Sequence, residues 1–410
     1  MNLKIKKTAI PFFVLFFPII IDSINGYLRG SEGSEESIIG ILYRGIIVVF
    51  SLLYLFRTVM SKYIILVFTS IFISLAYHFL VGYFTLSEIS PLIKVLYIYS
   101  VLSILLGNKQ CCNIRYVANC AIGYGLVAAV ILIYSFVFKV GYSSYVEDTF
   151  GTKGFFIAMN DVGLTILLLN VLACFFYLKT KEIKYLISIL IMSAGSALVG
   201  SMASYFGTAI ILGCFVLNVI FFKYDDYKSS KSFKVATIIA VLVILNVAVW
   251  RIIDIIIDDP YLSGKYSDIF KTISEMSGRD YLIDASLKVL GNYSFFDLLF
   301  GTGSNYMVQI QNVLHLPYPK SSEVDPLDLV GVYGLIFSTF LIIFPLFILF
   351  KSIRNFFTQK DLLSYWLIVG ISLYIFHSIY GGHAYTSPLV SSYLAVLIYL
   401  YIKRKELYNL

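Results

Sequence analysis

Residues 327–350 read LDLVGVYGLIFSTFLIIFPLFILF, and after Asp328 this stretch contains no charged residue. An apolar run of about 20 residues is long enough to cross a lipid bilayer as a helix, since each helical residue advances about 1.5 Å. The stretch therefore predicts a membrane-spanning helix, and it decides the fold class of the chain.

Similar apolar stretches occur along most of the chain. The 410 residues are 59% hydrophobic, and their mean hydropathy of +0.86 is far above that of a soluble domain. We predict an all-α polytopic membrane protein with about twelve transmembrane helices. The predicted spans are 8–27, 38–56, 63–83, 91–106, 117–138, 155–178, 184–201, 203–222, 233–256, 327–350, 362–380 and 386–402.

The loops between these spans carry positive charge unevenly. If the N-terminus is cytoplasmic, the inside loops and ends hold 20 of the 31 Lys and Arg residues, and the outside loops hold eight. Lys and Arg collect on the cytoplasmic side of membrane proteins. We therefore predict two cytoplasmic termini, and the net charge of +7 is mostly a topology signal. It does not indicate a nucleic-acid partner, which would need the basic residues on one soluble face.

Apart from residues in the first two positions of a span, the predicted spans contain six charged residues, each close to the outer end of its span. A charge at the centre of a bilayer costs at least about 2.5–3.5 kcal/mol, so such residues need a function or a partner. Their common depth predicts a polar site open to the external face. The six are Asp22, Arg44, Lys94, Asp161, Arg251 and Asp254.

One long segment separates two groups of spans. Residues 1–256 form a membrane domain of about nine predicted spans, and residues 327–410 contain three more with a cytoplasmic tail. Between them, residues 257–326 form a large external loop. Within it, apolar residues recur at helical spacing over 279–290, and a second apolar patch leads into Gly301-Thr302-Gly303. We predict a short helix on the membrane surface here.

Several motifs of this loop and of the following span occur in the same order in one known family. They are SGRD at 277–280, LFGTG at 299–303, EVD at 323–325 and DLVGVYG at 328–334. In this order they resemble the external loop and following span of bacterial O-antigen and capsule repeat-unit polymerases (Wzy type). The stretch 154–156 followed by Asn160 is also similar to this family.

Two positions depart from the family pattern. Ligase-like members of the superfamily carry a His in this loop, where this chain has Glu323, and the difference favours a polymerase over an O-antigen ligase. Family members often have a Ser-Arg pair where the seventh and eighth spans meet. This chain has Ser204-Tyr205, so one expected phosphate contact is absent.

The resemblance implies a GT-C-like fold and a glycosyl transfer at the outer face of the bacterial cytoplasmic (inner) membrane. In this reaction a growing glycan moves from undecaprenyl diphosphate to a sugar hydroxyl of the next lipid-linked repeat unit. The implied partners are this donor and acceptor, membrane lipid and a chain-length regulator. No cofactor is expected, and the sequence contains no Asp-x-Asp or clustered His pattern that predicts a metal.

A diphosphate leaving group gains negative charge as its bond breaks, and Arg can hold it through two parallel hydrogen bonds. The candidates on the outer side are Arg279, Arg44 and Arg251. Arg279 could instead be an ordinary residue at a helix start. For Arg44 and Arg251, snorkelling to the interface or pairing with Asp22 or Asp254 are equally open interpretations.

The acceptor hydroxyl needs a base, and a carboxylate or a His could serve. The candidates are Glu323, Asp325, His383 and, less favoured because it suits the helix dipole, Asp328. Glu323 and Asp325 lie just before a span, where they can face a cavity at the membrane surface.

Three further residues are candidates for substrate binding. Asn160 and Asp161 could bind sugar hydroxyls, or could simply cap the sixth span. His377 and His383 flank Gly381-Gly382 where the eleventh span ends, and His377 is placed with the substrate-binding residues.

A transporter of lipid-linked sugars (a flippase) is the main alternative from another class. Transporters tend to show paired halves and charges near the bilayer midplane. This chain shows unequal halves, and its charges lie near one face.

Overall fold

The computed structural model describes residues 9–29, 37–108, 112–144, 151–221 and 279–407. These residues are mostly helical, with one pair of short strands. The first part contains α1 (Ala9–Pro11), the π-helix η1 (Phe12–Phe16), α2 (Pro18–Arg29), α3 (Ile38–Leu52), η2 (Leu55–Arg57), α4 (Ser61–Val81), η3 (Leu86–Glu88), α5 (Ile89–Gly107), α6 (Ile114–Phe138), β1 (Tyr142–Ser143), β2 (Thr152–Gly154), α7 (Met159–Thr180), α8 (Ile183–Leu198) and α9 (Met202–Phe221). The second part contains α13 (Asp280–Gly291), α14 (Phe295–Phe300), α15 (Asn305–Leu314), α16 (Asp325–Gln359), α17 (Leu362–Tyr380), α18 (Pro388–Ile402) and α19 (Arg404–Leu407).

Eight helical segments in the described part of the chain are long and apolar enough to cross a membrane. They are Ala9–Arg29, Ser61–Val81, Leu86–Gly107, Ile114–Phe138, Met159–Thr180, Met202–Ile220, Asp325–Gln359 and Leu362–Tyr380. Three shorter apolar helices, α3, α8 and α18, accompany them. The chain is therefore a helical membrane protein. These helices match all the predicted spans except 233–256, which lies outside the described residues, so the count of twelve stays a prediction.

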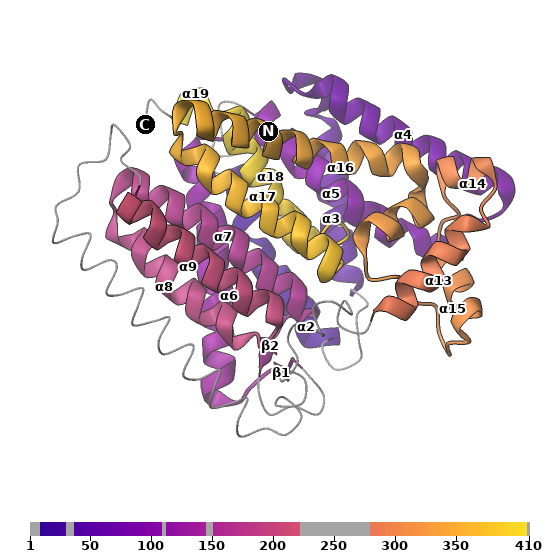
Figure 1. Ribbon diagram of the computed structural model, residues 1–410, viewed down its shortest axis with the longest axis horizontal. Coiled ribbons are helices and arrows are strands. Elements are labelled where there is room, and N and C mark those ends of the chain that lie inside the picture. The colour runs from indigo at the N-terminus through magenta and orange to yellow at the C-terminus, as the bar shows by residue number, and fades with distance from the viewer. Residues whose placement is uncertain (1–8, 30–36, 109–111, 145–150, 222–278, 408–410) are drawn as a thin grey trace, which may run out of the picture.

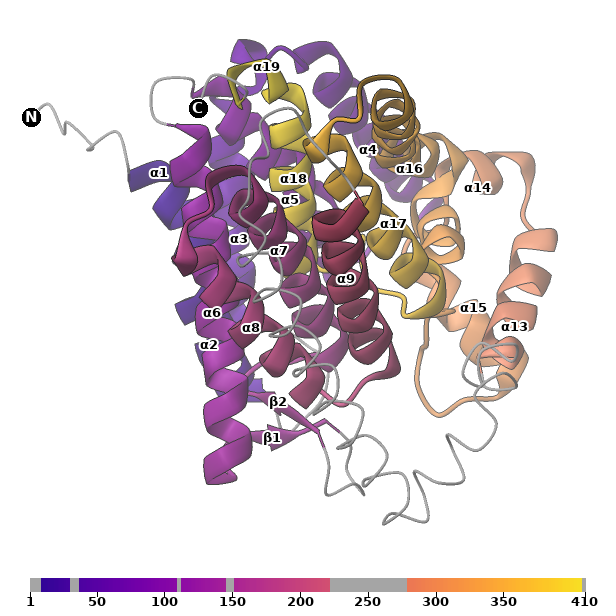
Figure 2. The ribbon, with the colours of Figure 1, turned by 60° about the vertical axis from the view of Figure 1, so that its left-hand side comes forward.

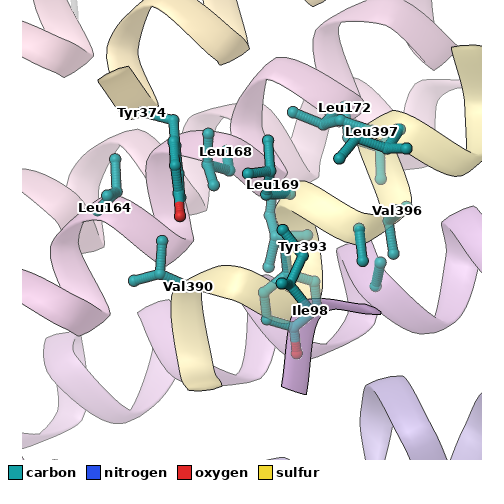
Figure 3. Packing of buried hydrophobic residues seen from close by; sticks show 14 of the residues in the cluster. Ile98, Leu164, Leu168, Leu169, Leu172, Tyr374, Val390, Tyr393, Val396 and Leu397 are labelled. Carbon is teal, nitrogen blue, oxygen red and sulfur yellow. The ribbon is translucent and has the colours of Figure 1, made fainter. Parts of the chain in front are cut away.

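Helix α7 lies at the centre of the bundle. It contacts α6, α8, α9, α17 and α18, and 94% of its most apolar stretch is buried. Figure 3 shows Leu168 and Leu172 of α7 beside Tyr374 of α17 and Leu397 of α18. In α4 only 39% of the comparable stretch is buried. Because a helix that is apolar on all sides packs in the centre or faces lipid, α7 is a core helix and α4 a lipid-facing one.

Helices α13, α14 and α15, here called the cap, lie together on one side of the bundle (Figures 1 and 2). The helix predicted over 279–290 is confirmed as α13, and it buries Leu282, Ala285 and Val289. This face packs against α15 and α16. The sequence predicted one short helix in this loop, whereas the described part contains three.

Helix α16 is interrupted at Gly334, whose φ of +80° is not helical. The interruption leaves carbonyl groups of the preceding turn without helical partners. Those of Gly331 and Val332 accept the backbone N–H groups of Thr302 and Gly303, each at 3.0 Å. A Cβ atom at position 334 would lie 2.3 Å from a carbonyl oxygen of α14, so only glycine fits. The beginning of α16 is therefore joined to the cap.

A buried group of polar contacts also attaches the cap to the bundle. The Nδ1 atom of His78 in α4 lies 3.2 Å from Oε2 of Glu88, and its Nε2 atom lies 3.1 Å from the carbonyl oxygen of Phe300. The other oxygen of Glu88 accepts the backbone N–H of Ser304 at 3.2 Å. Removing one member of such a group leaves a buried partner unpaired, so these contacts hold the cap against α4 and α5.

The strands β1 and β2 pair antiparallel and lie beside the lower end of α6 in Figure 2. The Tyr142 hydroxyl donates to the carbonyl of Tyr27 at 3.0 Å, and the Ser144 hydroxyl donates to the carbonyl of Val199 at 2.5 Å. The strand pair therefore ties α2 to the turn between α8 and α9. It leads directly into residues 155–161, which border the polar region between α2 and α7.

Candidate functional site

Residues from three parts of the chain meet where α16 begins. Arg279 precedes α13, Glu323 and Asp325 lie at the start of α16, and His383 lies in the loop after α17. We call these four, together with Asp328, the loop site. The structure therefore brings together one of the three predicted phosphate-binding arginines, Arg279, and all the predicted bases.

Arg279 connects the three parts. Its Nε atom donates to Oε2 of Glu323 at 2.6 Å, and its Nη1 atom donates to the carbonyl oxygen of Tyr380 at the end of α17. Lys320 Nζ lies 3.5 Å from the other oxygen of Glu323. The side chains of Arg279 and Glu323 are 17% and 24% exposed. Part of this ion pair is therefore open to a ligand.

The surroundings of Glu323 determine its charge. Burial raises the pKa of its carboxyl, but the charge of Arg279, the charge of Lys320 and the hydrogen bond from Arg279 act together against it, and the pKa lies below its ordinary value. Glu323 is therefore ionised at neutral pH. Its affinity for a proton is low as long as Arg279 stays in contact with it.

Asp325 and Asp328 are buried in the first turn of α16, where a carboxylate also suits the helix dipole. Asp325 accepts the backbone N–H of Tyr385 at 3.0 Å. Asp328 accepts both the backbone N–H and the hydroxyl of Ser322, each at 2.7 Å. Asp325 therefore fixes the loop after α17, and Asp328 fixes the loop that carries Glu323.

The backbone at this point is unusual. Glu323 and His383 have φ values of +57° and +62°, a region that residues other than glycine rarely occupy. A Cβ atom on Gly382 would lie 2.5 Å from the carbonyl oxygen of Glu323, so the two loops touch closely. Such strained positions cluster at functional sites. His383 itself is exposed.

His377 is placed differently from the other candidates. It is buried in the last turn of α17, and its carbonyl oxygen accepts the N–H groups of Gly381 and Gly382 at 2.7 and 2.9 Å. A Cβ atom on Gly381 would lie 2.6 Å from its Nε2 atom, so the ring packs against the turn. A contact between this ring and a substrate would need the loop to move.

A second polar region lies between α2, α3, α5 and α7. It is a cavity of about 70 Å³, here called the polar cavity. Four of the six charged residues that the sequence placed at one depth line it together, and they are Asp22, Arg44, Lys94 and Asp161. Its other lining residues are Asn25, Phe156, Ile157, Ala158, Thr386, Ser387, Pro388 and Leu389.

Arg44 is held by a buried partner. Its Nη2 atom lies 2.6 Å from Oδ1 of Asp22, and both side chains are 6% exposed. The second oxygen of Asp22 accepts the hydroxyl of Tyr124 at 2.8 Å. Of the interpretations left open for Arg44, pairing with Asp22 is therefore the one found in the structure.

The loop after α17 joins the two regions. The backbone N–H of Tyr385 contacts Asp325 of the loop site, and the next residues, Thr386 and Ser387, line the polar cavity. Asp161 lines this cavity, whereas its neighbour Asn160 is half-buried and not part of the lining. Arg251 and Asp254 lie outside the described residues.

Sequence reasoning missed several residues of these regions. Asn25 follows Asp22 by three positions, which places both on one face of a helix, so the spacing could have revealed it. Thr386 and Ser387 gave no such signal, because a polar pair before a span is common. In the sequence, Lys320 was only one of the positively charged residues of the outside loops.

Neither a similar known protein nor a metal site in the described residues indicates the function of the chain. No family model and no curated protein matches the chain. Within the described ranges, no group of three or more His, Cys, Asp or Glu residues could hold a metal ion.

Proposed function

We propose that this protein polymerises undecaprenyl-diphosphate-linked oligosaccharide repeat units into a surface polysaccharide, an O-antigen or a capsule. The observation that carries the proposal is the partly exposed Arg279–Glu323 pair at the start of a membrane-spanning helix. It places a permanent cation and a carboxylate together beside the membrane, where a lipid-linked diphosphate and a sugar hydroxyl would have to meet. The motifs that resemble the Wzy-type polymerases surround the same pair.

In the proposed reaction, a hydroxyl oxygen of the acceptor sugar attacks the anomeric carbon of the donor. The bond from that carbon to the diphosphate oxygen breaks, and its electron pair leaves with undecaprenyl diphosphate. Arg279 stabilises this leaving group, because a guanidinium offers several N–H donors in one plane. The hydroxyl proton passes to Glu323.

The ion pair links these two roles. A bound diphosphate competes with Glu323 for the guanidinium of Arg279. Once Glu323 loses this contact, its pKa rises, because one of the charges that lower it is now shared with the ligand. The base therefore gains proton affinity when the donor is bound. Asp325 and His383 are the alternative bases, and Asp328 positions the loop of Glu323.

We propose that the site faces the outside of the bacterial cytoplasmic membrane, with twelve spans, a GT-C-like arrangement and both termini in the cytoplasm. The Lys and Arg distribution supports this orientation. A reporter enzyme that works only outside the cytoplasm should be active when it is fused near Lys320, and one that works only in the cytoplasm should be inactive there. Activity restricted to the cytoplasm would contradict the orientation.

One observation favours a second candidate, the lipid-linked sugar transporter. Broken helices are typical of transporters, and α16 is broken at Gly334. The carbonyl groups freed there, those of Gly331 and Val332, already accept backbone N–H groups of the cap, however, so the break has a structural role. A ligase is the third candidate, and the Glu at position 323 argues against it.

A deletion strain separates these functions. Loss of a polymerase leaves surface lipid that carries a single repeat unit. Loss of a ligase leaves bare acceptor lipid, and loss of a transporter leaves repeat units on their carrier inside the cell. We expect the single repeat unit, restored to a full ladder by the gene on a plasmid.

A further inference from the structure

The polar cavity differs from the loop site in how its arginine is held. Its four charged lining residues are two cations, Arg44 and Lys94, and two carboxylates, Asp22 and Asp161. Their charges cancel. A diphosphate would gain little in such a place, because Arg44 is only 6% exposed and is already held by Asp22, whereas the Arg279–Glu323 pair is partly exposed. The prediction that Arg44 binds the diphosphate therefore does not fit the surroundings of this residue.

The same lining suits a ligand with many hydroxyl groups. Every hydroxyl both donates and accepts a hydrogen bond. Asp22 and Asp161 can accept, and Asn25 and Lys94 can donate. The lining also includes the apolar residues Phe156, Pro388 and Leu389. A sugar ring likewise presents both kinds of group, with hydroxyl groups at its edge and C–H groups on its faces.

The size of the cavity limits the ligand. A water molecule needs roughly 10–15 Å³ of such volume, so 70 Å³ holds about five waters. That is the size of one sugar ring. Asp22, Asn25 and Arg44 are buried, whereas Lys94 and Asp161 are partly exposed, so the ring would enter past the last two.

The buried part of the cavity is rigid before any ligand arrives. Asp22 is held by Arg44 and Tyr124, and Asn25 accepts the backbone N–H of Ser37 at 2.5 Å. Groups that are already fixed lose little conformational entropy on binding. The loop that contributes Thr386 also contacts Asp325, so a ring in this cavity is positioned relative to the proposed bases.

We infer that the polar cavity binds one uncharged sugar ring, the terminal ring of the acceptor repeat unit, while the diphosphate binds at Arg279. The acceptor's terminal ring is the choice because it is remote from its own diphosphate, whereas the reacting ring of the donor is bonded to one. This inference rests on the proposed function for the identity of the ligand. The lining residues alone support the class, a single neutral sugar.

Binding of a lipid-free probe tests the cavity directly. The probe is the repeat-unit oligosaccharide released by mild acid from the parent strain's own surface glycan. Its binding to the purified full chain is measured by saturation-transfer NMR and titration, in a detergent without a sugar headgroup. We expect wild-type protein to bind the terminal ring, and Asp161→Asn and Lys94→Met each to weaken binding by at least about 10-fold.

Matched variants serve as controls. Asp284 and Lys288 are exposed on the cap, so Asp284→Asn and Lys288→Met should bind like wild type. Arg279→Lys should also retain binding, because the probe carries no diphosphate. Asp161→Asn is nearly isosteric, so it decides the question if Lys94→Met does not fold.

The inference would be overturned if Asp161→Asn bound the probe as tightly as the wild-type protein does. It would also be overturned if the wild-type protein did not bind the probe at all. Competition by inorganic pyrophosphate would also overturn it, since that would mark an anion site. The failure of the proposed function looks different. In that case the deletion strain does not show surface lipid with a single repeat unit, whatever the probe does.

Discussion

Two Arg–carboxylate pairs with the same separation behave as different kinds of contact. Arg44–Asp22 and Arg279–Glu323 both have N–O distances of 2.6 Å. The first pair is only 6% exposed on each side and lies between α2 and α3 of the helical bundle. The second is 17% and 24% exposed and lies on loops.

Burial, more than the N–O distance, therefore decides whether such a pair holds the fold together or can exchange one partner for a ligand. A buried charge that loses its partner is costly, so Arg44 and Asp22 hold each other and frame the polar cavity. A partly exposed pair is worth little to stability, so Arg279 can exchange Glu323 for another anion. We therefore expect variants of the first pair to lose folded protein and variants of the second to lose activity.

The largest effect is expected at Glu323. Glu323→Gln keeps the shape of the side chain but removes the base, so the rate of polymerisation should fall by roughly 10²–10⁴-fold with normal protein levels. The measurement is the rate at which purified protein extends lipid-linked repeat units. Asp325→Asn and His383→Ala are the comparisons. Full activity of Glu323→Gln together with loss in one of the others would move the base to that residue.

The next effect concerns stability at the polar cavity. Arg44→Met leaves Asp22 buried without its cation and should cost about 3–5 kcal/mol. The double variant Asp22→Asn with Arg44→Gln removes both charges and should recover most of that loss. Thermal unfolding in detergent checks both. Equal loss in the single and double variants would show that the charge pairing is not what matters.

A smaller effect is expected from Arg279→Lys. Lysine keeps the charge but cannot donate from two fixed directions to Glu323 and Tyr380, as Arg279 does. Losing a hydrogen bond to a charged group costs about 1.5–3 kcal/mol, so polymerisation should slow by roughly 10–150-fold. Arg279→Ala should be at least as slow. A wild-type ladder from Arg279→Lys would remove this residue from the diphosphate site.

The smallest effect is the dependence of stability on pH. The pKa of Glu323 is lower in the folded chain than its ordinary value, so its ion pair stabilises the protein at neutral pH. This contribution is lost as the pH falls through the folded-state pKa. Arg279→Gln should therefore lower stability by less than about 1 kcal/mol at neutral pH, and the difference from wild type should disappear in acid. A difference that grows in acid would contradict the sign.

The membrane helices could be predicted from the sequence because span length and hydropathy are local properties. The predicted division between the spans 184–201 and 203–222 is also confirmed, since α8 ends at Leu198 and α9 begins at Met202. The break at Gly334 could not be foreseen. It depends on N–H groups of Thr302 and Gly303, which are distant in sequence. Helix α15 was missed because Asn and Gln interrupt its short apolar pattern.

The sequence predicted how far along its span each charged residue lies. It did not predict which of these residues share one cavity. Counting along each span placed Asp22, Arg44, Lys94 and Asp161 near one face, and the structure gathers them around one cavity. Whether charges at one depth also share one cavity depends on how each helix is rotated, which hydropathy does not encode. For the same reason the Arg44–Asp22 pairing stayed one interpretation among several.

The most direct test uses purified protein in liposomes supplied with the lipid-linked repeat unit on the accessible face. The account predicts glycans longer than one repeat unit and release of undecaprenyl diphosphate, both lost in Glu323→Gln. Transfer of intact lipid-linked units across the bilayer without any longer glycan would contradict it.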